Sequence, residues 1–131
     1  MPIDEHLDVG ELQSELGGAL RTAAVGDVES GEYEVRYMRP DVEREYSRET
    51  QDRIFESLVF EYLGSPARES DFEPLGELQF TTRSFENGHV VMCWSDETLL
   101  FVALDGSEHF VPVTMRLLRE QAERPPVASA D

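Results

Sequence analysis

The chain has 131 residues, a length that suits a single domain with one hydrophobic core. It carries 28 acidic and 11 basic residues, a net charge of −17, and this balance excludes the basic patch that a nucleic-acid-binding protein needs. The absence of a long apolar run excludes a membrane span, the first residues lack the pattern of a secretory signal, and the single cysteine excludes an internal disulfide, so we expect a cytoplasmic protein.

The first predicted element is a short helix that begins after Asp8. Apolar residues recur at helical spacing in this segment: Val9, Leu12 and Leu16. Asp8 is a suitable N-cap, and Glu11 three positions later would complete a capping box. Gly17 and Gly18 are then expected to end the helix.

Two strands that form a hairpin are predicted next. Residues 20–25 alternate weakly, because alanine prefers helices, whereas Tyr33, Val35 and Tyr37 alternate clearly with polar neighbours. A loop rich in glycine and acidic residues separates the two segments. By simple alternation, Tyr33 and Tyr37 should share one face of the second strand.

A helix over residues 48–63 follows Pro40. Ser47 is its expected N-cap, and Gly64 with Pro66 is expected to end it. Its apolar stripe consists of Phe55, Leu58, Val59 and Tyr62. Residues 65–76 contain two prolines and several acids, which predicts a surface loop.

Three further strands and a last helix complete the pattern. The segments ELQFTTRSF, HVVMCWS and TLLFVALDG are of strand length, and Asn87-Gly88 predicts a type I′ hairpin turn between the first two. Residues 99–104 are apolar on both faces, as in a central strand. The final helix should turn these side chains inward: Val111, Met115, Leu118 and Ala122. Residues 125–131 are expected to be a flexible tail.

The sequence therefore predicts an α+β fold over residues 1–124, a single domain with a five-stranded antiparallel sheet flanked by helices. Its element order is α-β-β-α-β-β-β-α, which resembles that of roadblock and profilin-like domains and, more loosely, that of PAS and GAF sensory domains. The likeness to these domains lies in element order alone.

Three segments carry a narrower resemblance: LRTAAVGDVESGEYEVRYMRPDV, YSRETQDRIFESL and RSFENG. They look like a group of small acidic haloarchaeal proteins with no assigned function, over a span from about Leu20 to Leu104. The acidic surplus without lysine also resembles cytoplasmic proteins of extreme halophiles, since molar salt shortens the Debye length to about 3 Å and screens the repulsion. An acidic interaction protein or a nucleic-acid mimic is the alternative reading of this charge.

The histidines and the cysteine are interpreted as structural. His89 and Cys93 would share a strand face but lie about 13 Å apart, too far to ligate one metal ion together. His6 and His109 have no spacing that would bring them to these residues. Cys93 stands between Met92 and Trp94 in an apolar run, where a thiol normally acts as a small hydrophobe. We therefore predict no metal site, no cofactor and no catalytic residue.

Contact with a partner or ligand is assigned to four residues: Tyr33, Arg36, Tyr37 and Trp94. Aromatic side chains at a sheet surface can anchor a partner, although core packing is the commoner role. Arginines at positions 36, 39, 44, 48 and 53 would otherwise form local ion pairs with the abundant acids.

These observations favour a non-catalytic cytoplasmic module that regulates or binds another protein, or pairs with itself as a homodimer. The resemblance to roadblock domains implies self-pairing through a sheet edge or a helix. The alternative is a sensory domain that holds a small ligand in a cavity lined by Tyr37, Met92 and Trp94. An enzyme of unrecognised chemistry is a third reading.

Overall fold

The computed structural model describes residues 7–123, and the side chains of all of these except residues 65–70. The predicted flexible tail at 125–131 and His6 lie outside the described residues. The elements in chain order are α1 (Val9–Leu16), a 3-10 turn η1 (Gly17–Ala19), β1 (Leu20–Asp27), β2 (Glu32–Met38), α2 (Pro40–Glu43), α3 (Arg48–Glu69), a second 3-10 segment η2 (Ser70–Leu75), β3 (Phe80–Phe85), β4 (Gly88–Ser95), β5 (Thr98–Asp105) and α4 (Phe110–Glu123). No helix within residues 7–123 is both long and apolar enough to cross a membrane.

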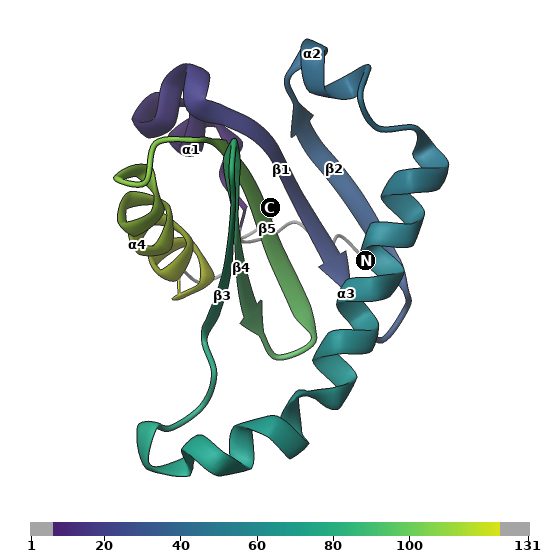
Figure 1. Ribbon diagram of the computed structural model, residues 1–131, viewed down its shortest axis with the longest axis vertical. Helices are drawn as coiled ribbons and strands as arrows, with labels where there is room; N and C mark the ends of the chain where they lie inside the picture. The colour runs from purple at the N-terminus through teal and green to yellow at the C-terminus, as the bar shows by residue number, and fades with distance from the viewer. Residues whose placement is uncertain (1–6, 124–131) are drawn as a thin grey trace, which may run out of the picture.

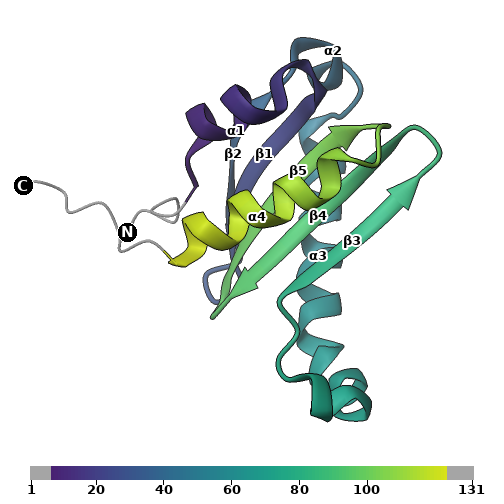
Figure 2. The ribbon, with the colours of Figure 1, turned by 90° about the vertical axis from the view of Figure 1, so that its left-hand side faces the viewer.

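The five strands form one antiparallel sheet in the order β2-β1-β5-β4-β3. The predicted α+β fold, with its hairpin, its three-stranded meander and its central last strand, is confirmed. Helices α1 and α4 lie on one face of the sheet and α3 crosses the other (Figure 1; Figure 2). The protein is thus a three-layer sandwich with the sheet in the middle.

Two apolar clusters fill the spaces between these layers. The larger lies under α1 and α4, where Leu12 and Leu118 pack on strand residues such as Val91 and Val102. The smaller lies under α3 and joins Phe55 and Leu58 to strand residues that include Met92 and Leu99. In β5, alternate residues serve the two clusters, which is why that strand is apolar on both faces.

A buried glutamine joins the two ends of the fold. Gln121 on α4 is fully buried; its Oε1 accepts from the backbone N–H of Asp8 (2.8 Å), and its Nε2 donates to the carbonyl of Asp8 (3.2 Å) and to Glu11 Oε1 (2.9 Å). Asp8 Oδ1 accepts from the N–H of Glu11, the predicted cap of α1. The start of the first helix is therefore fixed to the last one.

Three local predictions are wrong. Helix α3 continues through Gly64 and Pro66 to Glu69, because these two residues lower helix propensity without forbidding a helix. The second 3-10 segment, η2, occupies most of the rest of the expected surface loop. The Asn87-Gly88 pair is not a type I′ turn, because neither residue has a positive φ and Gly88 already belongs to β4. A Cβ at Gly88 would lie 2.7 Å from the carbonyl oxygen of Leu104, so the glycine serves a close approach of two strands.

Candidate functional site

The lone cysteine lies in the core and not at a reactive surface. Cys93 on β4 is 5% exposed and packs in the cluster beneath α1 and α4. Burial raises the pKa of its thiol to about 11, an effect that the charge of Arg119 opposes. Because the thiolate is the nucleophilic form, such a thiol is unreactive near neutral pH.

The histidine of the same strand holds the hairpin together. His89 is 5% exposed, with Nδ1 2.8 Å from Ser84 Oγ and Nε2 3.1 Å from the carbonyl of Gly106. A carbonyl only accepts, so Nε2 carries the proton and Nδ1 accepts from the serine hydroxyl in the neutral ring. His109 is exposed and lies 2.7 Å from Ser107 Oγ through Nδ1. Among the described residues, no group of three His, Cys, Asp or Glu side chains could hold a metal ion.

The four residues assigned to partner or ligand contact do not meet at one place. The β1–β2 register steps from Ala23 opposite Tyr37 to Ala24 opposite Val35, so Arg36 is an extra residue in β2. This bulge turns Tyr33 toward α3 and Tyr37 toward α1 and α4. The prediction that the two tyrosines share a face is therefore wrong.

Helix α3 is anchored to the sheet along a single row of residues at one end. Strand pairing places Tyr33, Gly26, Leu99 and Trp94 side by side across β2, β1, β5 and β4. The ring of Phe55 lies 5.0 Å from that of Tyr33 and directly over Gly26, and Tyr62 stacks on Trp94 at 4.4 Å. The next two rows of this face are covered only in part by the helix.

These two partly covered rows form the floor of a hollow of about 290 Å³. The row next to the anchor contains Val35, Ala24, Phe101 and Met92, and the following one contains Met38, Thr22, Ala103, Val90 and Arg83. The side chains of Ala24, Thr22 and Ala103 are too small to reach the helix, so the space stays open. As a result Phe101, although on a central strand, is only half-buried.

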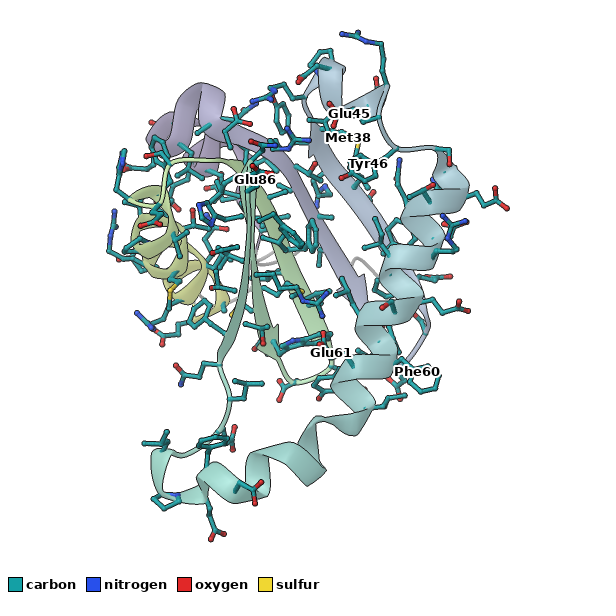
Figure 3. All side chains as sticks on the ribbon, viewed as in Figure 1. Met38, Glu45, Tyr46, Phe60, Glu61 and Glu86 are labelled. Carbon is teal, nitrogen blue, oxygen red and sulfur yellow. The ribbon has the colours of Figure 1, made fainter. Side chains whose placement is uncertain are left out.

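Met92 lines the hollow as the ligand reading predicted, but neither Tyr37 nor Trp94 does. The wall opposite the sheet is made by Ile54, Phe55 and Leu58 of α3, which sequence analysis did not connect with a cavity. Tyr46 and Met38 line the hollow near α2 (Figure 3). The sequence feature that could have indicated this hollow is the run of small residues in β1, the same residues that made the alternation of this strand weak.

The hollow differs in charge from the rest of the chain. None of the 21 described residues that line it is acidic. If acidic residues were as frequent in the lining as in the whole sequence, four or five of the 21 would be acidic. Its two charged lining residues are Arg21 and Arg83. Arg83 pairs through Nη2 with Glu61, which points from α3 toward the sheet while Phe60 points away (Figure 3).

Arg21 belongs to a cluster of ion pairs at the other end of the sheet. Its Nη2 lies 2.7 Å from Glu45 and its Nη1 3.5 Å from Asp105. Arg39 donates to Asp105 Oδ2 (2.8 Å), to Asp41 Oδ1 (2.6 Å) and to the carbonyl of Gly18 (2.6 Å). Hydrogen bonds from Arg39 hold the pKa of both Asp41 and Asp105 below the usual carboxyl range. This cluster ties the ends of β1, β2 and β5 together.

Strand β3 forms one outer edge of the sheet, and no described strand pairs with its far side. Its sequence, FTTRSF, contains no acidic residue. Leu78 and Phe85, just before and at the end of the strand, are 44% and 61% exposed. The opposite edge, β2, carries Glu32 and Glu34, which makes it a poorer surface for another chain of the same charge.

Comparison with known proteins places the chain by sequence family and by fold. The family model described as "Domain of unknown function (DUF7522)" matches residues 9–120. No curated protein matches the sequence. Among solved structures, the chain is similar to the Roadblock/LC7 domain from Streptomyces avermitilis, with a TM-score of 0.58 and 13% identity over 85% of this chain and 88% of that one. At this identity the likeness shows a shared fold and nothing finer.

Proposed function

The chain belongs to the DUF7522 family of domains of unknown function, and from this and its roadblock-like fold we propose that it is a non-catalytic module that regulates or assembles with other proteins. The observation that carries the proposal is the acid-free edge of β3 beside exposed apolar side chains. A free strand edge presents unpaired backbone groups to which another chain can add a strand. We infer that a second copy of this chain is one such partner.

Charge favours β3 over the rest of the surface for self-pairing. Two copies with a charge of −17 each repel one another at most orientations. Within β3 the only charged side chain is Arg83, and the nearest acids along the chain, Glu77 and Glu86, lie outside the strand, so the middle of two such edges can meet without opposed carboxylates. In antiparallel pairing centred on Thr82, Arg83 of one copy would lie opposite Thr81 of the other, so the two guanidinium groups would not oppose each other directly.

The test is a pair of variants that add the same charge at different places. Thr82→Glu sets two carboxylates opposite each other across the proposed axis, whereas Gln13→Glu adds its carboxylate on the exposed face of α1. Light scattering in 2 M KCl should give a dimer for wild type and Gln13→Glu and a monomer for Thr82→Glu. A wild-type monomer, or a Thr82→Glu dimer, would contradict pairing through β3. Circular dichroism of Thr82→Glu checks that the monomer is folded.

We also propose that the protein works in the cytoplasm of a salt-accumulating halophilic archaeon, as its composition suggests. Molar salt would then screen the electrostatic repulsion between this chain and other acidic proteins. The alternative, a sensory domain that holds a small ligand, is supported by one observation, the hollow beneath α3. Catalysis has no residue constellation in its favour among those described.

A further inference from the structure

We propose that the hollow beneath α3 binds an amphiphilic carboxylic acid, with an apolar body of about ten carbon atoms over the sheet and its carboxylate at Arg83. This assignment does not rest on self-pairing, since every residue it uses comes from one copy of the chain. It concerns the space between α3 and the two rows of the sheet next to the anchored row.

The size and lining of the hollow suit an apolar molecule. Its volume of about 290 Å³ is roughly twice that of a cavity known to hold benzene, about 150 Å³. Phe101 and Val90 are half-buried although both lie on inner strands of the sheet, and Ile54 on the opposite wall is 37% exposed. A ligand in the hollow would remove this apolar surface from water, which is the main source of affinity in such sites.

The charge around the hollow selects an anionic end group. Most of the protein surface repels an anion, because the chain carries 28 acids and they are spread along its length. The lining of the hollow contains none of them among the described residues, and it contains two arginines. A cationic ligand would be held better by the outer surface, whereas a carboxylate finds its complement only at a site of this kind.

Arg83 is the better of the two arginines for this role. Arg21 is neutralised by two carboxylates, Glu45 and Asp105, whereas among the described residues Arg83 forms an ion pair with one carboxylate, that of Glu61. A guanidinium has five N–H donors and can serve two carboxylates at once. With the carboxylate at Arg83, the apolar body runs across Val90 and Ala103 toward Met38 and Tyr46 at the α2 side of the hollow.

The first experiment compares three probes of equal chain length: decanoate, 1-decanol and decyltrimethylammonium. Isothermal titration calorimetry of the full chain in 1 M KCl should show one decanoate bound per chain, with 1-decanol binding about tenfold more weakly because it lacks the charge-assisted hydrogen bonds. The cationic probe should not compete with decanoate. Equal affinity for decanoate and 1-decanol, or no binding of decanoate, would overturn the proposal.

Substitutions then locate the site. Ala103→Leu places a larger side chain on the floor and should abolish binding, whereas Ser57→Leu, on the exposed outer side of α3, should leave it unchanged. Arg83→Gln should remove the preference for decanoate over 1-decanol, and Arg53→Gln, an exposed arginine outside the lining, should keep it. If Ala103→Leu binds decanoate as wild type does, the probe sits elsewhere and the proposal is wrong.

A variant that binds decanoate more tightly than wild type shows an effect that unfolding could not produce. Glu61→Gln removes the carboxylate that competes for Arg83, so decanoate should bind several-fold more tightly while 1-decanol is unaffected. Repeating the titration with Thr82→Glu separates the two proposals: unchanged binding in this variant supports the hollow of a single copy, whatever the oligomeric state. Loss of binding together with loss of the dimer would show that the hollow is completed by a second copy and would overturn the assignment made here.

Discussion

Replacing Gly26 by alanine should destabilise the protein, although the same change elsewhere in a chain often stabilises it. A Cβ at Gly26 would lie 2.3 Å from Cε1 and 3.0 Å from Cζ of Phe55. The ring has little freedom to move, because Phe55 is 8% exposed and lies against Tyr33. The added methyl group must therefore push α3 away from the row of residues that anchors it.

The size of the effect follows from two opposing terms. Alanine restricts the unfolded chain and by itself would stabilise by about 0.4–1 kcal/mol. Overpacking of a filled contact costs about 1–3 kcal/mol. The sum predicts that Gly26→Ala lowers the free energy of unfolding by roughly 0.5–2 kcal/mol.

Urea unfolding followed by the fluorescence of Trp94 measures this change. Trp94 is the only tryptophan and stacks on Tyr62 of α3, so its native signal also reports the position of the helix. Gly64→Ala is the matched control: nothing lies within 4 Å of its Cβ, and a helical alanine should stabilise by up to about 1 kcal/mol. Adding Phe55→Leu to Gly26→Ala should cost less than Phe55→Leu alone, since the two sites are coupled. A Gly26→Ala protein as stable as wild type would refute the anchoring of α3 by Phe55.

Two further predictions concern charge. Arg39 holds the pKa of Asp41 and Asp105 below the usual value of 3.8, so these carboxylates stabilise the fold above pH 3.8, and this stabilisation is lost as the pH falls through their folded-state pKa. In urea titrations, the Arg39→Gln variant should therefore lose less free energy of unfolding than wild type between pH 5 and about pH 3. Equal losses in the two proteins would exclude the ion-pair cluster as the cause. The thermal unfolding midpoint should rise steeply from 0.1 M to 2 M KCl, because the Debye length falls from about 10 Å to below 3 Å and repulsion among the acidic side chains is screened. A midpoint independent of the KCl concentration would show that this repulsion does not limit stability.

Local signals in the sequence were sufficient for most elements. Ser47 caps α3 as predicted, accepting from the N–H of Thr50 at 3.1 Å, and Gly17 ends α1 with a φ of 56°. The strands of the meander follow their apolar segments within a few residues. In each case the determining contacts lie within one element or one hairpin, which is the range over which residue patterns are informative.

The error on the faces of the two tyrosines and the failure to predict the hollow arose where the outcome depends on distant parts of the chain. The bulge at Arg36 has no signature within β2, yet one extra residue moves Tyr37 to the opposite face of the sheet. The hollow depends on Thr22, Ala24 and Ala103, which become neighbours only when β1 pairs with β5. Their small size was visible in the sequence, but its meaning required the position at which α3 is anchored.

The place of β1 in the sheet has a consequence for how the chain reaches its native state. β1 pairs with β5 in the centre, so that Leu20 meets Leu104 and Asp27 meets Thr98. These are contacts of high sequence separation, which slow folding because a long stretch of chain must close before they form. During translation the β1–β2 hairpin leaves the ribosome early but has no neighbour until β5 has also emerged. The nascent sheet therefore stays in two halves until β5 has been synthesised.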